Sequence, residues 1–360
     1  MNTRAQRPRP CLQTLNGEDS YESLSTSIVA AGCKVLAELQ DLNRKGWEDS
    51  NLDDHFQNWK KISAQPSTFE TATAWFKTYC RSMHDMNRQM KFIPDGPLNF
   101  LDLGCAPGGY SKCVLEANPK AIGTGICLPL DDGGHRFMLP KYMRARYTVH
   151  YSDMTRYSLR KSYLEGYAPP LPFPSASFGL VIADGHPLHT REFNERVPHL
   201  LLVTQLIIAL QAINEDGTIF IKLSKPASFR TACVLYLLDS VCSSLETIKP
   251  RTVHGNRGTF YTIARGVRRG KVLEGYVDIL YKMRQEIRDS AFDLDNALSV
   301  YEQIITLARL KESYIARLIE LGTPVWEVQR KYLGRFLRNK GMESPAQVEP
   351  NAENDVQADD

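Results

Sequence analysis

Residues 99–111 read Asn-Phe-Leu-Asp-Leu-Gly-Cys-Ala-Pro-Gly-Gly-Tyr-Ser, and this stretch decides the fold class. The pattern predicts a buried strand, a tight glycine turn and a helix from Tyr110. Glycine lets the backbone approach a ligand where a Cβ atom would collide, and a helix start offers free N–H groups to an anion. The glycine spacing does not fit the Gly-x-Gly-x-x-Gly pattern of dinucleotide sites. A plain strand–helix turn would explain one glycine, but not the whole stretch.

Apolar strands and helical stretches alternate around this turn. Strands are predicted over 98–103, 121–128, 147–151, 178–183, 218–223 and 259–264, with helices over 67–90, 200–213 and 228–244. This order is typical of an α/β protein with a mostly parallel, doubly wound, Rossmann-like sheet and helices on both faces. Such sheets bind ligands beyond the carboxyl ends of their strands. The glycine turn, Asp153 and Asp184 all fall at that edge.

The glycine turn resembles the first motif of the FtsJ/RrmJ-like S-adenosylmethionine (SAM)-dependent RNA ribose 2′-O-methyltransferases. The resemblance covers about residues 70–265. Residues 205–225 and the Lys249-Pro250 pair resemble the eukaryotic cap methyltransferase branch more than the bacterial rRNA branch. The resemblance implies a SAM-dependent methyltransferase sheet, SAM as cofactor and RNA as substrate.

The same resemblance implies a Lys-Asp-Lys-Glu catalytic tetrad. Lys77, Asp184 and Lys222 match its first three members, whereas Thr259 stands where the glutamate is expected. A ribose hydroxyl attacks only after losing its proton, and a lysine can accept that proton only when burial or a nearby cation lowers its pKa. The resemblance assigns this role to Lys222, beside Lys77, with Asp184 orienting the amine.

Simpler interpretations of the same three residues exist. An aspartate at a strand end, such as Asp184, is often a helix N-cap, and Lys77 alone would be an ordinary surface lysine. Lys222 is harder to dismiss, because a lysine in an apolar strand is costly unless it is paired. Glu246 or Glu192 could replace the missing acid if either lies nearby.

The resemblance also implies a set of cofactor-binding residues. They are Asp102, Gly104, Ala106, Pro107, Gly108, Gly109, Tyr110, Ser111 and Asp153. Asp153 matches the family's adenine contact, although an ordinary turn residue is an equally good interpretation. The reaction needs no metal, because the sulfonium loses its charge as the methyl group moves.

RNA binding is expected from local charge, since the net charge is only +3. Residues 136–161 hold seven basic residues and one acid, and residues 249–271 hold seven more with no acid. The first run is interleaved with Tyr142, Tyr147, Tyr151 and Tyr157. Basic groups neutralise phosphates and aromatic rings stack on bases, although a solvated basic face is a common alternative.

Composition divides the chain into five parts. We expect a flexible basic arm (1–24), an N-terminal helical segment (25–66), the methyltransferase domain (67–270), a helical extension that could dock a protein partner (271–341) and a disordered acidic tail (342–360). Ser67 and Glu70 form a candidate capping box, and Thr323-Pro324 a candidate helix start.

The cysteine pattern and the hydropathy exclude several further classes of site and segment. None of the eight cysteines falls in a Cys-x-x-Cys pair, so neither a zinc site nor a redox motif is expected. The spacing favours reduced thiols in the nucleus or cytoplasm. No apolar stretch resembles a signal peptide or is long enough for a membrane span.

Three functions compete at this point. The first is a SAM-dependent RNA ribose 2′-O-methyltransferase. The second is a degenerate relative that binds SAM or RNA without catalysis, for which Thr259 is the main support. The third is a methyltransferase acting on a small molecule, favoured if the site is closed and lacks a basic groove.

Overall fold

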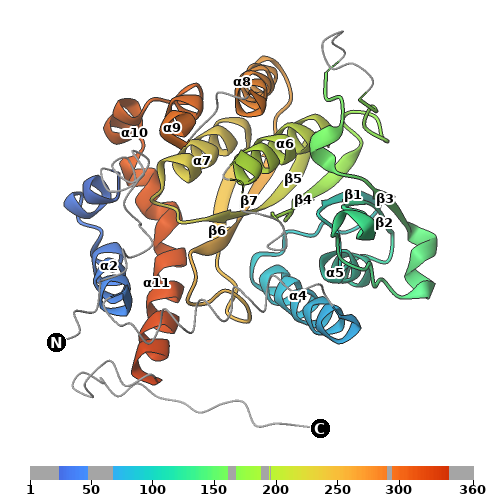
Figure 1. The fold of residues 1–360 in the computed structure, drawn as a ribbon, viewed down its shortest axis with the longest axis horizontal. Coiled ribbons are helices and arrows are strands. Elements are labelled where there is room, and N and C mark those ends of the chain that lie inside the picture. The colour runs from blue at the N-terminus through green and yellow to red at the C-terminus, as the bar shows by residue number, and fades with distance from the viewer. Residues whose placement is uncertain are drawn as a thin grey trace, which may run out of the picture.

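A computed structural model describes residues 24–47, 68–160, 168–187, 194, 196–289 and 294–339. Its centre is a seven-stranded sheet in the order β3-β2-β1-β4-β5-β7-β6, with helices on both faces (Figure 1). The strands are β1 (Leu98–Leu103), β2 (Ala121–Cys127), β3 (Tyr147–Tyr151), β4 (Phe178–Ala183), β5 (Ile213–Ser224), β6 (Ser244–Ile248) and β7 (Thr259–Val267). The predicted Rossmann-like α/β class is confirmed.

The first five strands are parallel, and β7 runs antiparallel between β5 and β6. The sequence pattern missed β6, because the helix expected over 228–244 ends at Val241 and the chain then turns into a strand. The ladder with β7 supplies backbone hydrogen bonds that override the local pattern there.

The labelled helices are α2 (Lys34–Trp47), α4 (Phe69–Met90), α5 (Gly109–Ala117), α6 (Arg196–Ala212), α7 (Phe229–Val241), α8 (Lys271–Arg288), α9 (Leu294–Glu302), α10 (Leu307–Ser313) and α11 (Ile315–Asn339). Residues 24–30 are also helical. A turn at Gly32, with φ of 95°, separates these residues from α2, so the expected N-terminal helical segment holds two helices within residues 24–47.

Alternation along the strands sorts the core into two layers. Leu101, Val181 and Ile221 face the helices α6 and α7. Phe100 and Phe220 face α4 and α5 on the other side of the sheet (Figure 1). Because successive strand residues point to opposite faces, polar residues two positions beyond Phe100 and Phe220 point to the α4–α5 side.

Helix α4 begins one residue later than the sequence suggests. Its N-cap is Thr68, whose hydroxyl oxygen accepts a hydrogen bond from the Thr71 N–H at 3.2 Å. The proposed cap Ser67 lies outside the described residues. Either hydroxyl can satisfy a free N–H group of the first turn, and the backbone places Thr68 at the cap position.

The C-terminal helices share the core of the sheet domain. Helix α8 packs on α6, and α11 packs on β6 and α2. Arg284 of α8 is fully buried and donates to the carbonyl oxygens of Thr155 and Tyr157, at 3.0 and 2.9 Å. These helices are thus built onto the sheet domain.

The expected helix start at Thr323-Pro324 is wrong. Pro324 lies inside α11. The Thr323 hydroxyl donates to the carbonyl oxygen of Ile319 at 2.7 Å. Packing of α11 against β6 and α2 offsets the loss of the one backbone hydrogen bond that a proline cannot make.

Several predicted segments lie outside the described residues: the basic arm up to residue 23, residues 48–67 of the N-terminal segment, and the acidic tail. Among the described helices, none is both long and apolar enough to span a membrane.

Candidate active site

The glycine turn lies between the ends of β1 and β4, where the order of the strands in the sheet reverses. Gly104 and Gly108 adopt φ values of 87° and 106°. A Cβ atom on Gly104 would stand 2.5 Å from the Cα of Gly185, at the end of β4. The backbone therefore leaves no space for a side chain, and the turn brings the two strand ends together. The Ala106–Pro107 peptide bond is cis.

A buried hydrogen-bonded group lies beneath this turn. Asp102 is 1% exposed and accepts a hydrogen bond from the Ser111 hydroxyl, which also lies 2.7 Å from the Tyr147 hydroxyl. Burial raises the pKa of Asp102 to about 7, although the Ser111 hydrogen bond acts in the opposite direction. This carboxyl group thus changes charge near neutral pH.

Asp184 and Lys222 form an ion pair at the sheet edge. Asp184 follows β4 and Lys222 lies near the end of β5, and the Nζ–Oδ1 distance is 3.0 Å. Only 12% of the Asp184 side chain and 17% of the Lys222 side chain are exposed. Burial raises the pKa of Asp184, and Lys222 limits that rise. The N-cap interpretation of Asp184 is thereby replaced by a buried ion pair.

Lys77 is not joined to this pair. Its side chain is exposed on α4 and makes no hydrogen bond or ion pair with the described residues. The geometry therefore brings together two of the three residues expected to act in catalysis. The role of Lys77 stays a prediction.

Three tyrosines pack behind the ion pair. Tyr261 lies directly opposite Lys222 in the β5–β7 ladder. Its hydroxyl lies 2.5 Å from that of Tyr110, whose ring meets Tyr79 of α4 edge-on. Burial and the charge of Asp184 raise the pKa of Tyr79 to about 12. All three rings thus stay neutral and exclude water from one side of the pair.

Gln205 holds the backbone next to Asp184, although it was not among the predicted site residues. Its side-chain oxygen accepts from the N–H of Gly185 at 2.8 Å, and its amide nitrogen donates to the Gly185 carbonyl at 3.0 Å. Both backbone polar groups of Gly185 are therefore held by one side chain from α6. A glutamine within the apolar run of α6 was the only hint in the sequence.

No carboxylate replaces the missing glutamate among the described residues of the site. Thr259 faces Ser224 across the ladder, and its carbonyl oxygen accepts a hydrogen bond from Lys249 at 2.6 Å. Glu246 pairs instead with Arg265 at 2.9 Å. Glu192, the other candidate, lies outside the described residues.

The loop between β6 and β7 adds a second residue that was not predicted. His254 lies close enough to Lys222 to feel its charge, and its Nε2 atom is buried with no hydrogen-bond partner among the described residues. Burial, followed by the charges of Lys222, Arg257 and Lys249, lowers the pKa of His254 to about 3. The ring is therefore neutral.

Asp153 caps a turn after β3. Its Oδ1 accepts from the N–H and the hydroxyl of Thr155, at 2.9 and 2.7 Å. The turn interpretation therefore accounts for one carboxylate oxygen. The other lies 3.9 Å from the Arg156 guanidinium. The adenine contact implied for Asp153 stays a prediction.

A cavity of about 400 Å³ adjoins the end of β5. It is enclosed by α2, α11, the residues after β5 and the β6–β7 loop. Its lining includes Gln40, Lys225, Arg257, Trp326, Gln329 and Phe336. The helical extensions therefore shape the surroundings of the candidate site.

Much of the first basic run has structural partners. Arg146 donates to the carbonyl oxygens of Leu115 in α5 and Ala121 at the start of β2. Arg160 lies 3.4 Å from Asp278. Lys161 lies outside the described residues. The run is thus a weaker phosphate-binding surface than its composition implies.

The tyrosines of that run divide into two pairs. Tyr142 and Tyr151 are 74% and 56% exposed, whereas Tyr147 and Tyr157 are buried. The expectation that all four interleave with the basic residues on one surface is therefore wrong, because two of them complete the core. Only the exposed pair can stack on bases.

Comparison with known protein families identifies the family to which this fold belongs. The model of the FtsJ-like methyltransferases matches residues 78–267. The chain belongs to the FtsJ-like methyltransferase family. The match contains the glycine turn, Asp184 and Lys222, and it begins just after Lys77. By family, the protein is a SAM-dependent methyltransferase.

Solved structures of other methyltransferases are distantly similar. A candidate ribosomal RNA methyltransferase from Plasmodium falciparum is 17% identical, with 52% of this chain and 96% of that chain covered and a TM-score of 0.37. Phosphoethanolamine N-methyltransferase 1 from Haemonchus contortus is 11% identical, covers 72% and 54%, and has a TM-score of 0.38. NodS from Bradyrhizobium japonicum is 11% identical, covers 52% and 86%, and has a TM-score of 0.33. The search of curated proteins found no match.

Proposed function

We propose that this FtsJ-like protein transfers a methyl group from SAM to a ribose 2′-hydroxyl of RNA, in the manner of the cap methyltransferase branch. The observation that carries the proposal is the Lys222–Asp184 ion pair at the carboxyl edge of the sheet. Burying a lysine beside a carboxylate costs desolvation free energy, so such a pair is weak evidence for a purely structural role. At this position it supports a role in moving a proton.

The residues around the glycine turn fit SAM as the cofactor. Gly104 and Gly108 have the positive φ values that a close backbone approach requires, and the start of α5 offers N–H groups to the carboxylate of a bound amino acid. Asp102 and Ser111 lie immediately beneath the turn. When bound, SAM supplies an electrophilic methyl group that needs no metal to activate it.

The chain's own groups would then prepare the nucleophile. The neutral amine form of Lys222 would accept the proton of the ribose hydroxyl and become the ammonium that pairs with Asp184, which orients the amine and balances this charge. Gln205 fixes the backbone at Gly185, the residue that follows Asp184. Correct placement of hydroxyl and methyl group supplies much of the rate in such transfers.

RNA as substrate is supported by exposed basic residues of the second run, such as Arg251, and by two exposed tyrosines, Tyr142 and Tyr151. Lys249 and Arg265 of that run have structural partners. The exposed faces of α8–α11 remain our candidate surface for a protein partner. An alternative function is a degenerate relative that binds SAM without turnover, and it is favoured by Thr259 and by the exposed position of Lys77, which forms no ion pair with the described residues.

Labelled SAM with capped and uncapped forms of the same RNA tests the proposal. Nuclease digestion and mass spectrometry of the product should show a 2′-O-methylated nucleotide. Preference for the capped form would support the cap branch. Binding of SAM with no methylated RNA would select the degenerate relative, and methylation of a small hydroxyl compound alone would select a small-molecule enzyme.

A further inference from the structure

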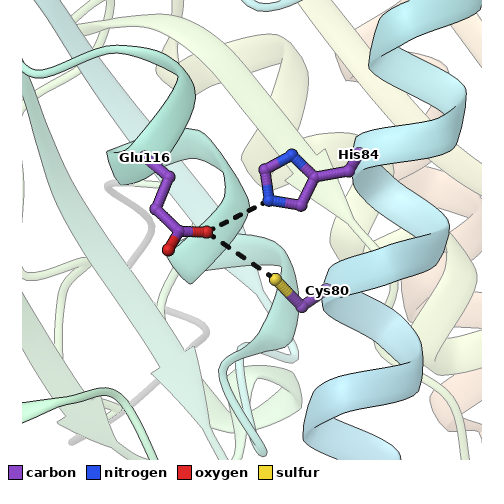
Figure 2. A group of neighbouring side chains, drawn as sticks. All are labelled: Cys80, His84 and Glu116. Atoms are coloured by element: carbon purple, nitrogen blue, oxygen red, sulfur yellow. Dashed lines mark hydrogen bonds and ion pairs between the residues drawn. The ribbon is translucent and has the colours of Figure 1, made fainter. Parts of the chain in front are cut away.

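Cys80, His84 and Glu116 form a polar cluster outside the candidate active site. Cys80 and His84 are one turn apart on α4, and both side chains point toward Glu116 on α5 (Figure 2). The Glu116 Oε2 atom lies 3.1 Å from His84 Nε2 and 3.9 Å from Cys80 Sγ. All three ligand atoms lie within 4.8 Å of one another.

From this arrangement we infer that the cluster binds a divalent zinc ion that clamps α4 to α5. Thiolate sulfur, imidazole nitrogen and carboxylate oxygen are the three ligand types that zinc prefers. Zinc bonds of about 2.0–2.3 Å in a tetrahedron place such ligand atoms roughly 3.3–3.6 Å apart. The observed spacings approach these values, so small side-chain rotations are sufficient. Water would complete the coordination.

The environment of the cluster already attracts a cation. The Lys112 ammonium lies 2.5 Å from Glu116 Oε1 and 3.7 Å from Cys80 Sγ. A zinc ion would replace this ammonium, whose flexible stem can turn into solvent. Lys112 is thus a competitor for the metal and not a ligand.

Accessibility also fits a metal site. Cys80 is buried between the helices, whereas His84 and Glu116 have 45% and 32% of their side chains exposed. Zinc can therefore enter from solvent and bind a thiol that packing protects. The ligands come from two helices that are distant in sequence. A search for Cys-x-x-Cys pairs therefore could not find this site.

The clamp would act on elements that carry the site already described. Cys80 lies one helical turn after Lys77, and α5 begins at the glycine turn. The two helices already pack so closely that a Cβ atom on Gly109 would stand 2.5 Å from the Phe76 carbonyl oxygen. Zinc binding would add a bond network across this contact. The inference does not rest on the proposed RNA substrate.

Zinc titration of the full chain tests the site. The protein is used without a tag, reduced and freed of metal with a chelator, and zinc is titrated against a chromophoric competitor. We expect one equivalent to bind, and Cys80→Ser or His84→Ala to weaken it by about tenfold or more, as losing a ligand should cost at least as much as losing an outer partner. Lys112→Met should tighten binding. His150→Ala, a histidine on β3, is the matched control.

Cobalt supplies a readout that does not depend on the stability of the variants. Cobalt(II) added to the wild-type chain should give the near-ultraviolet charge-transfer band of a thiolate ligand, and Cys80→Ser should lose it. Zinc should raise the unfolding temperature of the wild type, since it binds the folded state. Absence of stoichiometric zinc binding in both the wild type and Lys112→Met, or ligand variants that bind as the wild type does, would overturn the inference.

Discussion

The ammonium nitrogen of Lys222 lies 3.0 Å from Oδ1 of Asp184, and this contact joins the ends of two neighbouring parallel strands. Both residues point to the face of the sheet that α4 and α5 cover. Asp102, on the next strand, points to the same face. Period-two alternation thus places the proposed proton acceptor and the floor of the cofactor turn on one side of the sheet.

Gln205→Ala should slow methyl transfer while leaving the fold intact. Without the glutamine, the N–H and the carbonyl of Gly185 lose their partner, at a cost of about 1–3 kcal/mol in unfolding free energy. The peptide beside Asp184 would then move, so the turnover number should fall. Gln211→Ala is the control, because Gln211 makes one hydrogen bond from the same helix, to Leu159. Equal turnover numbers in the two variants would show that Gln205 does not position the catalytic residues.

Asp102→Asn should flatten the dependence of stability on pH. The pKa of this carboxyl group rises from 3.8 to about 7 on folding, chiefly through burial. The folded state therefore holds the proton more tightly, and its contribution to stability is present below pH 4 and lost as pH rises toward 7. The full shift corresponds to about 4 kcal/mol at most.

Chemical unfolding at about pH 5 and about pH 8 measures this effect. The wild type should lose more stability than Asp102→Asn over that interval. Parallel losses in both proteins would show that Asp102 has an ordinary pKa in the folded chain.

Thr259→Glu should increase methyl transfer. Thr259 lies two positions before Tyr261, which faces Lys222, so the side chains at 259 and 261 share one face of β7. A carboxylate there would add negative charge near Lys222 and also near Lys249, whose pKa burial lowers to about 7. Thr259→Gln is the control of equal shape. A rise with Glu alone would show that the missing acid limits the natural enzyme, whereas equal rates would show that it does not.

The sequence predicted the sheet and its glycine turn well, because apolar strands and turn glycines are local signals. It also paired Asp184 with Lys222, which only the family resemblance could do, since the residues are far apart in the chain. It could not place Lys77, because helical spacing does not say how near α4 brings that side chain to the sheet edge.

Gln205, His254 and the Cys80 cluster were missed for a shared reason. Each acquires its role through contacts between elements that are distant in sequence. Strand β6 was missed because its partner β7 stabilises it across the sheet. Buried tyrosines and structurally engaged arginines likewise reduced the RNA surface that composition suggested.

The most direct measurement is methyl transfer from labelled SAM to RNA by the wild type, Lys222→Ala and Lys222→Arg, with SAM binding measured alongside. Arginine keeps a positive charge beside Asp184 but cannot accept a proton. Lys120→Ala is a surface control, because Lys120 is exposed at the amino end of β2 and lies outside both basic runs. Both Lys222 variants should retain SAM and lose transfer by roughly a hundredfold or more. Transfer at the wild-type rate in either variant would contradict the assignment of Lys222 as the base.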